Sequence, residues 1–177
     1  MGEDPSDIFV TGCPSMDLAM DVVKNHELDF DPIVKYGGVG SKIDLTGDYL
    51  VVLQHPVTTE YDKAGKHVLE TLKAIAKLNL PTIWLWPNVD AGSDDTSGEI
   101  RSFREEINPQ NIYFMKNMSS VDFLKLLKNS RCIVGNSSVA IRECSFMGVP
   151  AVNIGTRQQS RERVKNVINV NYISIDI

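Results

Sequence analysis

Short runs of apolar residues recur along the chain, separated by segments in which apolar residues have a helical spacing. The runs are rich in β-branched side chains and do not alternate with polar residues, which is typical of strands covered on both faces. Seven strands are predicted on this basis, at residues 8–12, 49–53, 82–86, 112–115, 132–134, 151–154 and 172–176.

Apolar residues at steps of three and four predict helices over residues 62–78, 119–128 and 138–147. Ser119 is a predicted N-cap with Asp122 at a capping-box-like position, and Gly148 is a typical helix stop. Residues 25–47 have no clear period and are interpreted as a loop. Alternating strands and helices predict the α/β class, with a Rossmann-like doubly wound parallel sheet.

Length and charge limit how many domains the chain can form and which classes of ligand it can bind. The chain has 177 residues and a net charge of −5, so residues 1–177 are expected to form one domain. An acidic chain lacks the broad positive field that favours nucleic acid or an anionic membrane. The three cysteines have no CxxC spacing and no apolar run is long enough to span a bilayer. We expect reduced, buried thiols in a cytoplasmic protein.

Ligands of doubly wound sheets bind at the carboxyl ends of the strands, so residues that follow the predicted strands are candidates for a site. His55 follows the second predicted strand, and Asn88 and Asp90 follow the third. The alternative is purely structural. Asn88 and Asp90 are common turn residues, and an isolated His55 at a turn can simply face solvent.

The most specific local feature follows the fifth predicted strand. Ser137 and Ser138 begin the helix predicted there, where free N–H groups and hydroxyls favour a phosphate. Glu143 lies further along the same segment and could accept hydrogen bonds from a ribose diol. An ordinary N-cap with an acidic first turn explains the same residues equally well.

Three arginines follow the sixth predicted strand, among them Arg157. Arginine binds phosphate in a bidentate manner, although a solvated loop of mixed charge has the same composition. The sequence contains no GxGxxG, no P-loop and no GxSxG motif, so no standard dinucleotide, P-loop or hydrolase site is indicated. The three histidines lack ligand spacing, so neither a metal nor a cofactor is expected.

Four motifs in order resemble one enzyme family. They are QHPVTT at 54–59, PNVDAGS at 87–93, GNSS at 135–138 followed by RE at 142–143, and GTRQ at 155–158. Together they are similar to the C-terminal half of the hydrolysing UDP-N-acetylglucosamine 2-epimerases. The resemblance covers nearly the whole chain. It implies one of the two Rossmann-like domains of a GT-B fold, with UDP or UDP-N-acetylglucosamine as ligand.

The resemblance also implies roles for individual residues. Ser137 and Ser138 would hold the β-phosphate, Glu143 the ribose hydroxyls, and Asn88 and Arg157 would line the cleft. His55 would lie near the diphosphate and act in charge neutralisation or in proton transfer to the leaving group. Residues 115–118 would run alongside the uracil and contact it through their backbone groups. The implied reaction eliminates UDP and then hydrates the resulting glycal to N-acetylmannosamine, for sialic or related nonulosonic acid synthesis.

In that family the N-terminal domain supplies most of the catalytic carboxylates. We therefore expect this chain to need that domain and to be inactive alone. The full-length protein is expected to form a homo-oligomer. Three alternatives stay open: a UDP-sugar-binding domain of a GT-B glycosyltransferase, a 2-epimerase for a 2,4-diacetamido UDP-sugar, and a regulatory module of the same fold. The last rests on residues 94–106, with Arg101 and Arg104, which resemble a feedback region of the animal enzymes.

Overall fold

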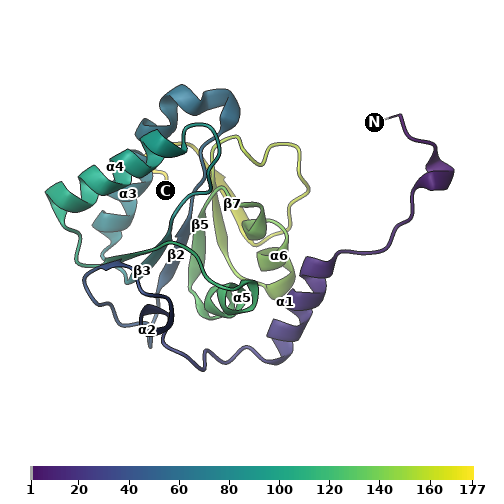
Figure 1. The fold of residues 1–177 in the computed structure, drawn as a ribbon, viewed down its shortest axis with the longest axis horizontal. Helices are drawn as coiled ribbons and strands as arrows, with labels where there is room; N and C mark the ends of the chain where they lie inside the picture. Colours follow the sequence, from purple (N-terminus) through teal and green to yellow (C-terminus); the bar gives the residue numbers. More distant parts are fainter. Residues whose placement is uncertain (1) are drawn as a thin grey trace.

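The protein was analysed as a computed structural model, which describes residues 2–177. Seven strands form one sheet in the order β1-β4-β3-β2-β5-β6-β7 (Figure 1). Without the short β1, this is the order 3-2-1-4-5-6 that is typical of Rossmann folds. The strands are β1 (Val39–Gly40), β2 (Leu50–Leu53), β3 (Thr82–Leu85), β4 (Ile112–Met115), β5 (Cys132–Gly135), β6 (Ala151–Ile154) and β7 (Val167–Val170).

The predicted α/β class and doubly wound sheet are confirmed. Strands β2 to β7 pair in parallel, whereas β1 pairs antiparallel with β4 at one edge. The α-helices are α1 (Pro14–Lys24), α2 (Pro32–Tyr36), α3 (Ala64–Leu78), α4 (Ser93–Ile107), α5 (Ser120–Asn129) and α6 (Glu143–Met147). Three 3₁₀ segments accompany them: η1 (Pro5–Asp7), η2 (Thr58–Lys63) and η3 (Ser138–Ala140).

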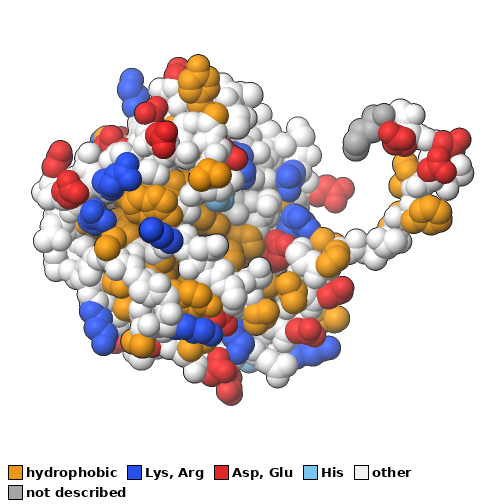
Figure 2. Space-filling model, viewed as in Figure 1, with side chains coloured by type: hydrophobic (Ala, Val, Ile, Leu, Met, Phe, Trp, Pro, Cys, Tyr) orange, Lys and Arg blue, Asp and Glu red, His pale blue; other side chains and the backbone are white. Residues whose placement is uncertain are grey.

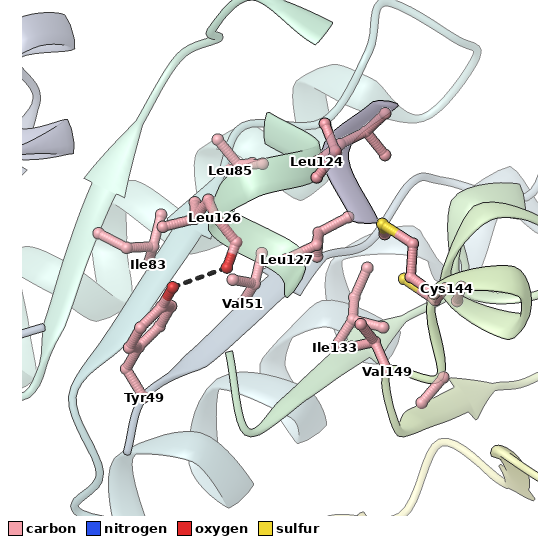
Figure 3. Packing of buried hydrophobic residues seen from close by; sticks show 14 of the residues in the cluster. Tyr49, Val51, Ile83, Leu85, Leu124, Leu126, Leu127, Ile133, Cys144 and Val149 are labelled. Carbon is pink, nitrogen blue, oxygen red and sulfur yellow. Dashed lines mark hydrogen bonds between the residues drawn. The ribbon is translucent and has the colours of Figure 1, made fainter. Parts of the chain in front are cut away.

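Alternate residues of the strands β2 to β6 enter two separate hydrophobic clusters, one on each face of the sheet. In β2, Val51 packs with α1, α5 and α6, whereas Val52 packs with α3 and α4. Figure 1 shows α3 and α4 on one side of the sheet and α1, α5 and α6 on the other. The first cluster also contains a buried polar contact, in which the Tyr49 hydroxyl donates to the Leu126 carbonyl oxygen at 2.7 Å (Figure 3). Because both faces are covered, the central strands are continuously apolar.

Two of the predicted strands are wrong. Residues 8–12 form no strand; they belong to an exposed arm in which Phe9 is 80% and Val10 98% exposed. The arm projects from the body and carries apolar and acidic side chains (Figure 2). Residues 172–176 also form no strand. The last strand of the sheet, β7, lies earlier in the chain, at Val167–Val170. None of the four residues of β7 is buried, and the polar Asn169 interrupts its apolar residues, so a search for continuous apolar runs misses it.

The helix predicted over residues 138–147 is also wrong in its extent. It is split into η3 and the five-residue α6, with Arg142 between them outside ideal helical geometry. Its predicted stop is confirmed, since Gly148 adopts the left-handed conformation with φ 72°. The Ser119 N-cap is confirmed as well, because its hydroxyl accepts from the Asp122 N–H at 3.2 Å.

Residues 25–47 are not one loop, because they contain α2 and β1. The missed signal is Asp31-Pro32, in which Asp31 caps α2 and the proline occupies its first turn. Helix α4 was not predicted either. Few apolar residues mark its inner face, and those that are buried there are Thr96, Ile100 and Phe103. Among the described residues, no helix has both the length and the apolar character needed to cross a membrane.

The three cysteines are free. Only Cys144 is buried, and burial raises the pKa of its thiol to about 12. Cys13 and Cys132 are partly exposed, so the expectation that all three thiols are buried is wrong for these two.

Candidate functional site

The strand order reverses between β2 and β5, and the carboxyl ends of these two strands meet there. Gly135 ends β5 against the end of β2, and a Cβ atom on Gly135 would lie 2.1 Å from the Leu53 carbonyl oxygen. Only glycine permits this approach. The Asn136 N–H then donates to the Leu53 carbonyl oxygen at 3.2 Å. In doubly wound sheets this switch point is where a crevice for ligands opens.

The side chain of Asn136 connects the two strand ends. Its Oδ1 accepts from the His55 N–H at 2.7 Å, and its Nδ2 donates to the His55 carbonyl oxygen at 2.8 Å. The Asn136 carbonyl oxygen accepts from Gln158 Nε2 at 2.8 Å and from Arg157 Nη1 at 3.3 Å. The loops after β2, β5 and β6 therefore meet on one residue, which is fully buried.

The His55 imidazole is held from its other side by the loop after β3. Its Nδ1 accepts from the Asn88 N–H at 3.2 Å. Burial, together with a smaller effect of the Arg157 guanidinium, lowers the pKa of His55 to about 4, whereas Asp90 and the hydrogen bond with Asn88 act in the opposite direction. The ring is therefore neutral at neutral pH. Because Nδ1 is an acceptor, the remaining proton sits on Nε2, which makes this atom a hydrogen-bond donor.

Asn88 and Arg157 are joined through Asp90. Asn88 Nδ2 donates to Asp90 Oδ2 at 2.8 Å, and Arg157 Nη2 lies 3.6 Å from the same oxygen. From the sequence, Asp90 is either a turn residue or part of a site. In the structure it fixes the arginine of one loop beside the histidine of another, so the predicted residues His55, Asn88 and Arg157 are brought together.

Ser137 and Ser138 follow Asn136 directly and so lie at the same edge of the sheet. Neither hydroxyl is hydrogen-bonded to a described residue, and Ser137 makes no side-chain cap. Ser137 is the N-cap and Ser138 the first residue of the three-residue η3, where the sequence predicted a regular ten-residue helix. The expected helix dipole is therefore short, and hydroxyls and individual N–H groups are the donors that remain for an anion.

Glu143 is the first residue of α6, not a residue inside a longer helix as the sequence suggested. It is only 7% exposed, and its carboxylate makes no hydrogen bond or ion pair with the described residues. Its oxygens are not among the buried side-chain atoms that lack a partner, so the carboxylate reaches the surface and is free to accept from the hydroxyls of a ligand.

Two hollows open on this edge of the molecule. One, of about 320 Å³, lies at the ends of β2, β3 and β4, and it is lined by His55, Asn88, Lys116, Asn117, Met118 and Phe123. The other, of about 380 Å³, lies between the loops after β2 and β6, and it is lined by Thr58, Thr59, Glu60, Asp90, Thr156 and Arg157. Residues 116–118, predicted from the resemblance, therefore border the same hollow as His55.

The largest cavity lies elsewhere and is a weaker candidate. It measures about 670 Å³ and is lined by residues near the amino end of β2, including Ile43 and Tyr49. Its two aspartates are already used within the fold, since Asp31 caps α2 and Asp44 accepts from the Thr46 N–H and hydroxyl. Size alone therefore does not locate the site, and the switch point offers more free polar groups.

Among residues 2–177 no group of three His, Cys, Asp or Glu side chains could hold a metal ion. The residues that sequence reasoning missed are Asn136 and Gln158. Both lie in motifs quoted above, GNSS and GTRQ, but neither was assigned a role. The one available signal is that Asn136 directly follows a buried strand, where a carboxamide must find partners, although the sequence does not show which partners it finds.

Comparison with known proteins identifies the family. The family model described as UDP-N-acetylglucosamine 2-epimerase matches residues 1–177. The chain belongs to the UDP-N-acetylglucosamine 2-epimerase family. The resemblance predicted from the four motifs is thereby confirmed.

Curated relatives of this 2-epimerase family chain are longer proteins. It is 28% identical over 172 residues to the UDP-N-acetylglucosamine 2-epimerase of Neisseria meningitidis serogroup B, covering 97% of this chain and 42% of the relative. It is 31% identical over 176 residues to the UDP-N,N'-diacetylbacillosamine 2-epimerase (hydrolyzing) of Legionella pneumophila, covering 96% of this chain and 42% of the relative. The chain thus spans less than half the length of these relatives.

Solved structures support the fold of this 2-epimerase family member. The UDP-GlcNAc 2-epimerase of Methanocaldococcus jannaschii, in complex with UDP-GlcNAc and UDP, matches with a TM-score of 0.67 and 17% identity, covering 99% of this chain and 47% of that one. The N. meningitidis enzyme bound to UDP-GlcNAc matches with a TM-score of 0.65 and 16% identity, covering 98% of this chain and 46% of that one. The predicted Rossmann-like half of a GT-B fold is confirmed.

Proposed function

We propose that this chain is the UDP-binding half of a hydrolysing UDP-N-acetylglucosamine 2-epimerase. The observation that carries the proposal is the convergence of His55, Arg157 and the pair Ser137–Ser138 on the switch point of the sheet. A nucleotide diphosphate needs several donors in one place, and these residues supply them in a chain whose net charge is −5.

The free polar groups suggest how the nucleotide is held. The Ser137 and Ser138 hydroxyls, with nearby N–H groups, would donate to the β-phosphate. Arg157, whose side chain is partly exposed, would face the same charge. Glu143 would accept from the two ribose hydroxyls, since its carboxylate makes no hydrogen bond to the described residues. The uracil would occupy the hollow bordered by residues 116–118.

His55 would act as a donor. Because its pKa is lowered to about 4, it would not contribute a positive charge at neutral pH. Its Nε2–H would instead donate a hydrogen bond to the bridging or β-phosphate oxygen of the departing UDP and would keep its proton, because a neutral imidazole is far too weak an acid to protonate a phosphate. Of the two roles that the resemblance implied, neither charge neutralisation nor full proton transfer fits a neutral ring, and hydrogen-bond donation to the leaving group takes their place.

The proposed reaction of the whole protein has two stages. Removal of the sugar C2 proton and elimination of UDP give a glycal, and addition of water then gives N-acetylmannosamine for sialic or related nonulosonic acid synthesis. The proton at C2 needs a base, which we assign to the part of the relatives that this chain does not span. The chain alone is therefore expected to bind the nucleotide and to catalyse no turnover.

A second substrate is favoured by one comparison. The relative from L. pneumophila, at 31% identity, acts on UDP-N,N'-diacetylbacillosamine. A 2,4-diacetamido UDP-sugar has the same UDP group and would use the same residues of this chain. Product analysis of the full-length protein with both UDP-sugars separates the two candidates.

Calorimetric titration of the chain with UDP tests the proposal. Glu143→Ala and Ser138→Ala are expected to weaken binding at least tenfold. Ser102→Ala and Glu105→Ala, which change exposed positions on α4, are matched controls and should bind like the parent chain. Absence of UDP binding at millimolar concentration would contradict the proposed site. Release of UDP from UDP-N-acetylglucosamine by the chain alone would contradict the proposal that the catalytic base lies in the part of the protein that this chain does not span.

A further inference from the structure

Three loops of the proposed site have no regular secondary structure directly after their strands, so something else must fix them relative to one another. The loop after β2 carries His55, the loop after β5 carries Ser137, and the loop after β6 carries Arg157. Asn136 lies in the loop after β5. Among the described residues of the three loops, it is the only one that is hydrogen-bonded to both of the other two, through His55 after β2 and through Arg157 and Gln158 after β6. Its placement is therefore decisive for the geometry of the site.

We propose that Asn136 is a positioning residue, whose buried carboxamide fastens His55 to the switch point and holds the three loops in register. The proposal deepens the proposed function, on which its ligand-binding consequence rests. The chemistry explains why an asparagine is needed. The His55 N–H requires an acceptor and the His55 carbonyl oxygen requires a donor, and one planar carboxamide supplies both, at 2.7 and 2.8 Å.

The neighbours of Asn136 make this arrangement specific. Gly135 lets the end of β5 approach β2, which brings the short asparagine side chain within reach of the next loop. Asn136 is 0% exposed, so water cannot replace its bonds. An aspartate would keep the acceptor for the His55 N–H, but it would direct a second oxygen at the His55 carbonyl oxygen and lose the donor.

The imidazole depends on this backbone placement. Asn136 fixes the main chain of His55, and the Asn88 N–H fixes the ring through Nδ1. If the main chain moves, the 3.2 Å bond from Asn88 is broken and the ring loses its single tautomer. The proton on Nε2 would then no longer be directed at one place. Asn136 therefore acts through His55 and does not itself need to contact the nucleotide.

A matched control exists at the amino-terminal ends of the strands, away from the carboxyl ends that form the switch point. Asn111 is also buried, and its carboxamide donates to the Ile75 and Leu80 carbonyl oxygens at 3.1 and 3.2 Å. It directly precedes the amino end of β4, far from the switch point. Asn136→Asp and Asn111→Asp thus remove the same kind of buried donor at two ends of the fold.

The test combines UDP calorimetry with NMR of the histidine ring nitrogens, recorded without ligand. Asn136→Asp is expected to weaken UDP binding at least tenfold and to give His55 a mixture of tautomers, with a titration midpoint closer to 6.5. Asn111→Asp should leave both within twofold of the parent chain. Arg157 and Asp90, which face the ring, are the same in all three proteins. Asn136→Asp also adds a carboxylate beside His55 that raises its titration midpoint by charge alone, so Asn136→Ser, which adds no charge, must show the same mixture of tautomers.

Two results would overturn the proposal: a loss of affinity in Asn136→Asp no larger than in Asn111→Asp, or ring-nitrogen signals of His55 unchanged from the parent chain. If the parent chain itself does not bind UDP, the proposed function fails for this domain, and the NMR comparison alone decides the role of Asn136. If Asn136→Asp does not fold, Asn136→Ser takes its place, because its shorter hydroxyl cannot bridge both groups.

Discussion

Acidification should destabilise this domain through the His55 imidazole. Burial lowers the pKa of His55 from 6.5 to about 4 in the folded protein, with a further contribution from Arg157. Above pH 6.5 the ring is neutral in both the folded and the unfolded chain. As the pH falls from 6.5 towards 4, the unfolded chain gains a proton that the folded chain does not accept, so the equilibrium shifts towards unfolding.

The size of the effect follows from the two pKa values. One pKa unit corresponds to about 1.4 kcal/mol, so a change from 6.5 to about 4 corresponds to at most about 3.5 kcal/mol, of which about 3 kcal/mol is lost by pH 4. This contribution is fully present above pH 6.5 and is lost below about pH 4. A domain usually has about 5–15 kcal/mol of stability in total, so the loss should be measurable.

The assay is urea unfolding of the parent chain and of His55→Gln at several pH values between 7.5 and 4. The difference in unfolding free energy between the two proteins should fall by about 3 kcal/mol over this range. His67, whose pKa is also lowered by burial, is present in both proteins and its effect cancels. His26→Gln, at an exposed position, is the matched control. Parallel pH dependences of the parent chain and His55→Gln would refute the reasoning.

Four further substitutions test the fold, each by urea unfolding at pH 7. Gly155→Ala should cost more than about 1 kcal/mol, because Gly155 has φ +70° and an added Cβ would lie 2.2 Å from the Tyr172 ring. Gly98→Ala, in open space within α4, should instead stabilise the protein by about 1 kcal/mol. Leu127→Ala should cost about 2–5 kcal/mol because the side chain is fully buried, and a cost below about 1 kcal/mol would argue against the core packing described. Ser119→Ala should cost about 1 kcal/mol by removing the cap of α5, and no change would show that the cap contributes nothing.

The central strands could be predicted from sequence because burial on both faces leaves a strong local signal. β2 and β3 are continuously apolar, and the order of elements then determines the doubly wound topology. The edge strand β7 has one exposed side and lost that signal. Residues 8–12 show the opposite error. Their β-branched composition suits a strand, but none of the described strands pairs with them.

The candidate site was predictable to the extent that topology alone places residues. Strand-end residues such as His55 and Arg157 were expected at one edge, and the structure brings them together. The role of Asn136 could not be found in the same way. Its partner His55 lies 81 positions earlier in the chain, and nothing local distinguishes a bridging carboxamide from one in a turn. The neutral state of His55 likewise depends on burial and on Arg157, which only the folded arrangement supplies.

Mapping UDP onto the chain by amide NMR tests the central claim most directly. The account predicts that the shifts of residues 54–59, 116–118, 135–138 and 155–158 change on titration with UDP, because these segments surround the switch point. The cavity near Ile43 and Tyr49 should be unaffected. Shift changes confined to that cavity, or no saturable change at all, would contradict the claim that the switch point holds the nucleotide.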